Sequence, residues 1–406
     1  MIEGPRVRDD GRGGPALPAL GRFRSLALIA GVAGLVLAAL GWLLDPASFF
    51  AGYLAAYLLW SGIALGCLGT ALLQQVTGGL WGLTLRRIAE AGARTLPLVA
   101  VMFVPLLFGL TVLYPWMRPD EVAASRTLQQ KTPYLNLPFF VGRAVLYMVC
   151  WLALARVLDH RSAEEDRTAD PAVTGRLWRL GVGGLIALGL TAAFAMIDWV
   201  MSLEPEWYST IYPSMVATGS LLGAFAFMIL VALFLAPQSE LGALVTPRVR
   251  NDLGSMLLAF LMLWAYQSFS QYLLIWSGNL QEEAPWYVRR ESGLWGWAAI
   301  AIVALGFFVP FFVLIFREIK RSTRWLAATA GLVLAMRAVE DLWLVGPGLG
   351  LGGLYVAIGL AAMVGLGGIW LWWLGRQLLA RPLVPLHDPR LAEAPGIAAE
   401  AEHAGA

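Results

Sequence analysis

Three charged residues interrupt an apolar stretch in the last quarter of the chain, at a spacing that suits proton exchange. Arg337, Glu340 and Asp341 stand at positions i, i+3 and i+4, which share one face of a helix. Two further carboxylates, Asp198 and Glu204, lie at and just beyond the end of another apolar stretch. A carboxylate buried among apolar helices can hold a proton at neutral pH and pass it on. Asp198, Glu204, Glu340 and Asp341 are therefore the predicted proton-transfer residues.

Other polar side chains accompany these carboxylates. Arg143 and Tyr147 are four residues apart in one apolar stretch, and Tyr266, Gln267 and Gln271 lie together in another. If the stretches cross a membrane as helices, all five side chains fall in the same half of it as the carboxylates. Polar groups inside a membrane are costly and usually face a protein interior or a watery cavity. We expect them to position the carboxylates by hydrogen bonding and charge.

Each of these residues also has a purely structural interpretation. The charged triad could neutralise itself along one helix, since an isolated intramembrane charge costs far more. Asp198 could be a solvated or helix-capping carboxylate, and Arg143 an interfacial anchor or the partner of an acidic residue. Gln267 and Gln271 could form inter-helix hydrogen bonds. The glycines of the last apolar stretch indicate close helix packing, at Gly359, Gly365, Gly367 and Gly368.

The elements that must carry these residues are transmembrane helices. Of the 406 residues, 59% are apolar and only 14% are charged, whereas roughly a quarter are charged in soluble proteins. Apolar stretches of about 20 residues, each able to cross the hydrocarbon core, recur throughout the chain. The composition predicts an all-α polytopic membrane protein, with residues 26–380 as the membrane domain and residues 1–25 and 381–406 as flexible tails. Ten spans are expected, at 26–44, 48–73, 96–116, 138–158, 178–201, 210–236, 253–277, 293–316, 325–346 and 351–379.

The distribution of basic residues predicts the orientation. With the N-terminus inside, the inner segments hold 22 of the 29 Lys and Arg residues and the outer segments hold 5. Lys and Arg are enriched in cytoplasmic loops, so both termini are expected in the cytoplasm and loops 117–137 and 278–292 outside. The polar side chains of the spans then lie in the outer half of the membrane.

Several classes of function are excluded. The only cysteines, Cys67 and Cys150, are far apart, and the three histidines lie outside the predicted spans. The chain therefore has no ligand pattern for an iron–sulfur cluster, covalent haem or intramembrane haem, and no metal site is predicted. No phosphate-binding glycine motif is present, which excludes a nucleotide-driven pump. A formal net charge of +2 excludes the electrostatic footprint of a nucleic-acid-binding protein.

Three sequence stretches carry a resemblance to a known family. They are AMIDWVMSLEPEWYST at 195–210, FSQYLLIWSGN at 269–279 followed by EEAPWY at 282–287, and RAVEDLW at 337–343. Together with the ten-span layout, they resemble the smaller NrfD-like (polysulfide-reductase-C-like) membrane subunit, the F subunit, of alternative complex III. That complex is the bacterial quinol:cytochrome c oxidoreductase. The resemblance covers roughly residues 25–380.

The resemblance implies a fold, partners and a place in the cell. It implies two four-helix bundles with a flanking helix pair in the bacterial inner membrane. The expected partners are multihaem cytochrome c, iron–sulfur and second NrfD-like subunits, which would hold the metal centres on the outer side. It also implies quinol oxidation at that side, with ubiquinone or menaquinone, and a proton path. The polar cluster that would serve them comprises Arg143, Tyr147, Tyr266, Gln267, Gln271 and Arg337.

Three hypotheses of different classes follow. The leading one is a subunit that handles quinol or conducts protons, although the chain lacks the histidine that quinol sites often use. A stand-alone secondary transporter would instead show broken helices and internal repeats at the midplane, and Pro105 and Pro310 interrupt two of the spans. A purely structural anchor would make the polar cluster incidental. Copurification with redox subunits separates the first hypothesis from the second, and substitution of the carboxylates in the intact complex separates it from the third.

Overall fold

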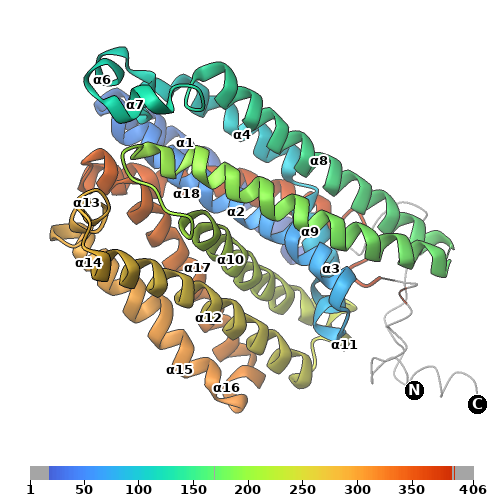
Figure 1. Ribbon diagram of the computed structural model, residues 1–406. Helices are drawn as coiled ribbons and strands as arrows, with labels where there is room; N and C mark the ends of the chain where they lie inside the picture. Colours follow the sequence, from blue (N-terminus) through green and yellow to red (C-terminus); the bar gives the residue numbers. More distant parts are fainter. Residues whose placement is uncertain (1–17, 169, 386–387, 389–406) are drawn as a thin grey trace, which may run out of the picture.

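The computed structural model describes residues 18–168, 170–385 and 388, and within them every regular element is a helix (Figure 1). The longer helices are α1 (Pro18–Leu44), α2 (Pro46–Thr77), α3 (Leu80–Ala93), α4 (Leu96–Phe108), α8 (Leu137–Thr168), α9 (Pro171–Trp199), α10 (Tyr212–Leu235), α12 (Pro247–Gly278), α17 (Thr323–Val345) and α18 (Gly353–Leu378). One further long helix combines α14 (Gly293–Ala301), a π-helical segment η4 (Ile302–Phe308) and α15 (Val309–Ile315).

Short helices make up the connections. They are α5 (Leu110–Leu113), η1 (Pro115–Met117), α6 (Pro119–Ala124), α7 (Arg126–Lys131), η2 (Met201–Leu203), η3 (Ala236–Gln238), α11 (Leu241–Leu244), α13 (Ala284–Val288), α16 (Arg317–Arg321) and η5 (Pro347–Leu349). The joint between α1 and α2 shows why the chain breaks where it does. The Asp45 carboxylate accepts hydrogen bonds from the amides of Ala47 and Ser48, and Pro46 occupies the first position of α2, where no amide donor is needed.

The membrane character expected from the sequence is confirmed. Eight helices of the described residues are long and apolar enough to cross a membrane, or up to nine if α3 and α4, which meet at a 43° bend, form one broken span. Helix α17 is not among the eight, because it carries four charged residues in its 23 positions: Arg324, Arg337, Glu340 and Asp341. The fold is therefore all-α and polytopic. The total of ten crossings and the division into two bundles stay predictions.

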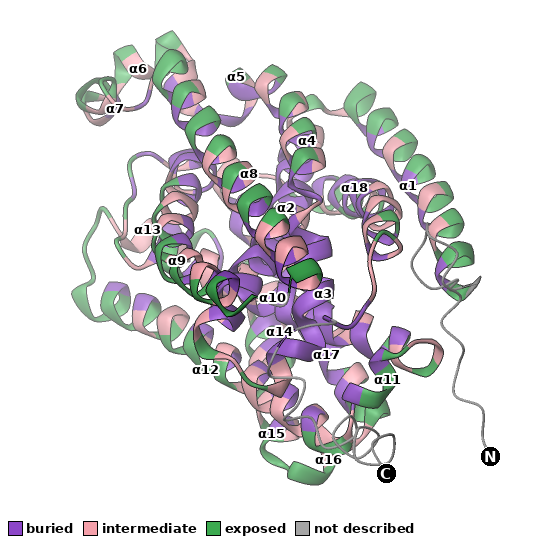
Figure 2. Cartoon of the chain, turned by 90° about the vertical axis from the view of Figure 1, so that its right-hand side faces the viewer, coloured by how far each residue is buried: buried purple, intermediate pink, exposed green. Residues whose placement is uncertain are grey.

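Helix α2 lies at the centre of the molecule. Of the 18 residues that form the most apolar part of α2, 89% are buried, whereas the corresponding part of α1 is 28% buried. Figure 2 shows α2 and α10 as buried elements with the largely exposed helices α1, α8 and α12 around them. Helix α2 packs against α1, α3, α4, α9, α10, α17 and α18. This arrangement leaves the outer faces of the surrounding helices apolar and free to face lipid.

Helices α1 and α18 pack closely and run antiparallel. A Cβ atom added to Gly31 would lie 2.8 Å from the backbone nitrogen of Ile369, and one added to Gly34 would lie 2.6 Å from that of Gly365. A Cβ on Gly368 would lie 2.2 Å from the carbonyl oxygen of Ala27. The close packing predicted from the glycines of this region is confirmed, because small residues let two backbones approach.

We expect Gly368→Val to separate α1 from α18. The added side chain would meet backbone atoms of α1, which cannot move aside as a flexible side chain can. Overpacking of this kind costs about 1–3 kcal/mol or more of the free energy of unfolding, which denaturation of the detergent-solubilised protein measures. Gly189→Val on α9 is the control, because a Cβ there has open space within 4 Å. Equal loss in both variants would contradict the prediction.

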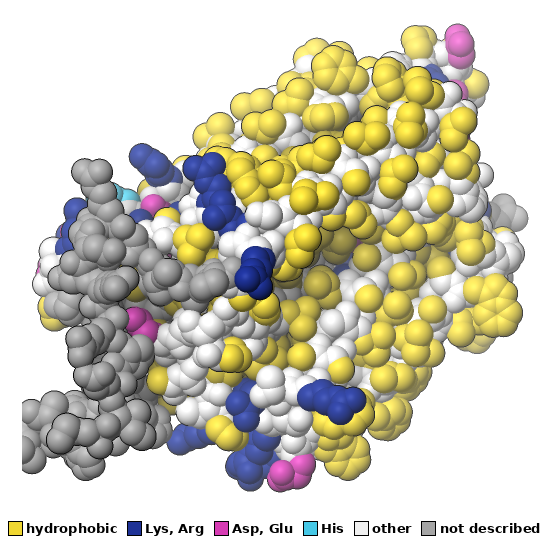
Figure 3. All heavy atoms as spheres, turned by 180° about the vertical axis from the view of Figure 1, so that it is seen from behind, with side chains coloured by type: hydrophobic (Ala, Val, Ile, Leu, Met, Phe, Trp, Pro, Cys, Tyr) yellow, Lys and Arg dark blue, Asp and Glu magenta, His cyan; other side chains and the backbone are white. Residues whose placement is uncertain are grey.

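Charged residues gather at one end of the molecule. Figure 3 shows Lys and Arg concentrated toward that end and a largely apolar surface over the rest of this face. We call it the basic end, which holds α3, α11 and α16, and the opposite end, which holds α6, α7 and α13, the distal end (Figure 1). Because Arg and Lys favour the cytoplasmic side, the basic end is the expected cytoplasmic end.

Three boundaries differ from the sequence-based expectations. Residues 80–93, expected within an inner loop, form the buried helix α3. Residues 18–25, expected in the N-terminal tail, are the first turns of α1, whereas residues 1–17 lie outside the described part. The first residues of the C-terminal tail pack on the protein, because Leu383 and Val384 are buried and Arg381 pairs with Asp159. Residues 386, 387 and 389–406 of this tail lie outside the part of the chain that the structure describes.

Candidate functional site

A buried ion pair joins α8 to α9. The Arg143 guanidinium donates from Nε and Nη2 to the two carboxylate oxygens of Asp198, each at 2.8 Å, and the Tyr147 hydroxyl donates to the same carboxylate at 2.8 Å. Arg143 also donates from Nη1 to the carbonyl of Tyr134, and its guanidinium lies 3.8 Å from the centre of that ring. One positive and one negative group therefore neutralise each other in a closed, fully bonded pair.

This pair changes the interpretation of Asp198. The carboxylate is only 1% exposed, so the alternative of a solvated or capping carboxylate is wrong. The alternative of Arg143 as the partner of an acidic residue is confirmed. Helices α8 and α9 are neighbours, and their pairing sets the two side chains at the same height. With each oxygen engaged, Asp198 is suited to holding helices together.

A second charged group lies on α17, and in it the ratio of basic to acidic side chains is different. Arg337 donates to Glu340 and lies 3.8 Å from the Asp341 carboxylate, and Trp264 on α12 donates to Glu340 at 3.1 Å. All three charged residues are 4% exposed. The guanidinium has room because residue 219 on α10 is glycine, where a Cβ would lie 2.5 Å from it. One arginine thus faces two carboxylates inside the helix assembly.

The two-to-one ratio gives this triad a chemical capacity that the pair at Asp198 lacks. A single guanidinium neutralises one carboxylate, and a second ionised carboxylate beside it in a medium of low polarity is costly. Two carboxyl groups so close titrate as a unit and can share one proton. The triad is neutral when it holds one proton and carries one net negative charge after release, so it favours holding a proton that it can pass on.

Glu204 lies at the distal end between two arginines. Its carboxylate oxygens accept from Arg290 Nη2 and Arg289 Nη1, both at 2.6 Å. The Arg290 side chain is fully buried and also donates to the carbonyls of Trp286 and Leu344, whereas the Arg289 side chain is 50% exposed. Glu204 thus connects the buried interior near α17 with the surface of the distal end.

The loop that carries Glu204 is held by the connection between α4 and α8 at the distal end. Lys131 donates from Nζ to the Pro205 carbonyl at 2.6 Å, and the Ser125 hydroxyl donates to Glu206 at 3.1 Å. Burial lowers the pKa of the Lys131 ammonium, while the Glu206 charge acts in the opposite direction. These contacts fix the backbone on either side of Pro205 and so set the position of the Glu204 carboxylate.

The predicted polar residues of α12 have structural roles. Gln271 accepts from the Ser209 hydroxyl, and Gln267 donates to the Ser214 hydroxyl on α10 at 3.1 Å. The contact of Gln267 bears out its interpretation as an inter-helix hydrogen bond, whereas Gln271 joins α12 to the loop before α10. The Tyr266 side chain is 69% exposed, on the surface that the spans present to lipid.

The sequence predicted one polar cluster, but the structure contains separate groups. Arg143, Tyr147 and Asp198 lie between α8 and α9, whereas Arg337, Glu340 and Asp341 lie between α10, α12 and α17. Within the described part of the chain no hydrogen bond or ion pair joins the two groups. Helix α10 separates them, because it contacts α9 on one side and α12 and α17 on the other.

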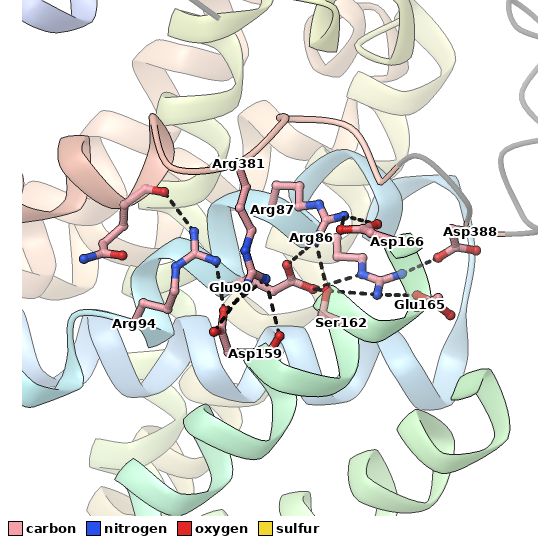
Figure 4. Close-up of polar contacts among 11 residues, drawn as sticks. Arg86, Arg87, Glu90, Arg94, Asp159, Ser162, Glu165, Asp166, Arg381 and Asp388 are labelled. Atoms are coloured by element: carbon pink, nitrogen blue, oxygen red, sulfur yellow. Dashed lines mark hydrogen bonds and ion pairs between the residues drawn. The ribbon is translucent and has the colours of Figure 1, made fainter. Parts of the chain in front are cut away.

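The largest charged network was not predicted as a site (Figure 4). At the basic end, Glu90 of α3 accepts from Arg86 at 3.0 Å and from Arg87 at 2.7 Å, and the Ser162 hydroxyl of α8 donates to it at 2.7 Å. Arg86 continues to Glu165 and to Asp388 of the C-terminal segment, each at 2.6 Å. Arg87 continues to Asp166, and beside this network a second group pairs Asp159 with Arg94 and Arg381 (Figure 4). The spacing of Arg86, Arg87 and Glu90, which places them on one helix face, is the signal that could have revealed it.

Comparison with known proteins adds no family assignment: no protein-family model and no curated protein matches this chain. The resemblance to the NrfD-like subunit therefore rests on the three sequence stretches and the predicted layout of the spans. The geometry adds that two of these stretches meet in space. Trp286 of the second stretch contacts Trp343 of the third at 5.4 Å between ring centres.

Proposed function

We propose that this chain is a membrane subunit of a bacterial quinol:cytochrome c oxidoreductase complex that accepts and conducts quinol protons at the outer side of the membrane. The observation that carries the proposal is the buried group of Arg337, Glu340 and Asp341, in which one arginine faces two carboxylates. A group of this kind can take up a proton when quinol is oxidised nearby. Its place among membrane helices suits a reaction whose substrate is dissolved in lipid.

The proton path follows the carboxylates toward the distal end. Glu340 or Asp341 would accept the proton, and Glu204, paired with Arg289 and Arg290, would pass it to the surface. Asp198 is assigned a positioning role between α8 and α9, because its carboxylate is fully engaged by Arg143 and Tyr147. With the basic end in the cytoplasm, this path releases protons outside.

The complex divides the chemistry among its subunits. In this proposal the chain contributes no metal or haem centre, and the multihaem cytochrome c, iron–sulfur and second NrfD-like subunits supply the electron path. The quinone is ubiquinone or menaquinone, bound at the outer side of the inner membrane. Both termini of this chain face the cytoplasm, in accordance with the 22 basic residues of its inner segments.

The test is turnover in an intact complex purified through this chain. Glu340→Gln and Asp341→Asn each leave Arg337 one carboxylate, so both variants should assemble. We expect quinol:cytochrome c turnover to fall at least about tenfold in one or both, because a positioned proton acceptor contributes about 10²–10⁴-fold and its neighbour replaces part of that. Glu121→Gln, which removes an exposed outer-loop carboxylate, is the control and should keep full turnover.

Two results would remove the proposal. Full turnover in both assembled variants would exclude the triad from the reaction and favour a structural anchor. Purification of the chain without any haem or iron–sulfur subunit, together with solute movement in proteoliposomes, would favour the secondary transporter.

A further inference from the structure

An apolar cavity lies beside the triad. Its volume is about 570 Å³ and it is bounded by α12, the π-helical segment η4, the region of α13 and α17. Figure 1 shows α12, α14, α15 and α17 as neighbours on one side of the molecule. Glu340 forms part of the inner wall, while Tyr266 and Phe269 on the other side are 69% and 63% exposed. The cavity therefore opens on the apolar surface of the chain, and its size is within the range of ligand pockets.

The inner wall presents polar atoms that nothing in the described chain engages. The indole Nε1 of Trp343 and the hydroxyl of Ser268 are both buried and lack a hydrogen-bond partner. Buried polar atoms without a partner are rare in folded proteins and call for an explanation such as a bound molecule. An indole donates only, and a hydroxyl both donates and accepts. These two atoms and the Glu340 carboxylate could therefore bind a ligand that carries both a carbonyl and a hydroxyl oxygen.

The remaining lining determines what kind of ring fits. Trp264, Trp286, Trp343 and Phe307 surround the space with aromatic faces, which favour a flat ring through offset stacking or edge contacts. The one cation of the lining, Arg290, is paired with Glu204, and its Nη atoms also donate to two backbone carbonyls, so only its Nε lacks a partner. The cavity thus offers no free positive charge for an anion. A neutral flat ring with oxygen substituents and an apolar tail is the matching chemistry.

The π-helical segment shapes the opening of the cavity. Ile302 and Val303 at its start and Phe307 and Phe308 at its end line the space. Pro310, which follows the segment, has no amide proton to donate to the carbonyl of residue 306, so a regular α-helix cannot continue through this turn. π-Helical turns within α-helices are frequent at functional sites.

We infer that this cavity is a binding site for a quinone or quinol ring, with Glu340, Trp343 and Ser268 contacting the ring oxygens and the tail leaving between α12 and η4 into lipid. The inference rests on the proposed function for the redox class of the ligand. It adds to that function a location for the ring, between α12 and α17 and away from Arg143 and Asp198.

The test is photolabelling of the full-length chain in lipid nanodiscs with an azide-bearing analogue of decylubiquinone. We expect labelled peptides from residues 262–272 or 299–308, and at least tenfold less labelling when excess decylubiquinone or menaquinone-2 is present. Ala299→Trp, which fills the cavity from α14, should lower labelling at least tenfold. Ala193→Trp, at a half-buried alanine of α9 that does not line the cavity, should leave it unchanged. Trp343→Phe, which removes the indole donor together with part of the aromatic surface, should weaken binding several-fold.

The outcomes separate this inference from the proposed function. Labelling at α8 and α9, or labelling that excess quinone does not reduce, would overturn the cavity as a quinone site even if the complex turns over. Specific labelling of the cavity in a chain that copurifies with no redox subunit would keep the inference and remove the proposed function.

Discussion

Asp198→Ala is expected to destabilise the protein by about 3–5 kcal/mol, because it leaves the buried Arg143 guanidinium without its counter-charge. The pair is bidentate at 2.8 Å, and its carboxylate is 1% exposed. Removing one partner of such a pair costs more than the pair contributes, since the remaining charge stays in a medium of low polarity. Denaturation of the detergent-solubilised chain measures the loss as a change in the free energy of unfolding.

A triple variant distinguishes an unpaired charge from a general loss of packing. Arg143→Met, Tyr147→Phe and Asp198→Leu together remove both charges and the hydroxyl that donates to Asp198. Replacing a whole buried ion pair by apolar residues of similar volume is often neutral, so this variant should recover most of the stability. Asp198→Ala as stable as the unaltered chain, or a triple variant no more stable than Asp198→Ala, would contradict the structural role assigned to the pair.

The second large effect is expected at the basic end. Glu90 lies between Arg86 and Arg87, and all three side chains are at most 3% exposed. Glu90→Ala would remove the carboxylate that both arginines share and leave the Ser162 hydroxyl without its acceptor. Arg86 keeps Glu165 and Asp388 as counter-charges and Arg87 keeps Asp166, so the loss comes from the broken hydrogen bonds and not from an unpaired charge. We expect about 1.5–3 kcal/mol less free energy of unfolding, measured by the same denaturation.

A surface pair provides the matched control for this prediction. Glu121 pairs with Arg118 at 2.6 Å and the same i, i+3 spacing as Arg87 and Glu90, but its side chain is 47% exposed. Glu121→Ala should cost no more than about 1 kcal/mol, because exposed ion pairs contribute little. Similar losses at Glu90 and Glu121 would show that burial does not decide the strength of the network.

The sequence alone was sufficient for the membrane class and for much of the helix layout. A backbone in lipid must satisfy its hydrogen bonds within each helix, so a run of about 20 apolar residues is a local signal. For example, the stretch expected at 48–73 lies within α2, and the stretch expected at 253–277 lies within α12. The same rule missed α3, because Arg86, Arg87 and Glu90 made a buried helix resemble a charged loop.

The site was predicted in its residues but not in its arrangement. Spacing along one helix correctly associated Arg337 with Glu340 and Asp341. It contained no information on the pairing of Arg143 with Asp198, which are 55 residues apart. The glutamines of α12 and the pair at Asp198 were therefore grouped with the triad, although α10 separates Asp198 from it.

The amino-acid sequence thus established the all-α membrane class, much of the helix layout and the contacts within single helices, since these depend on residues a few positions apart. Only the tertiary structure decided which charges are closed into one-to-one pairs, which remain as two carboxylates on one arginine, and where a cavity opens beside them. Those features depend on how separate helices pack against each other. The cavity beside Glu340 is bounded by α12, η4, the region of α13 and α17, segments that meet only when the chain is folded.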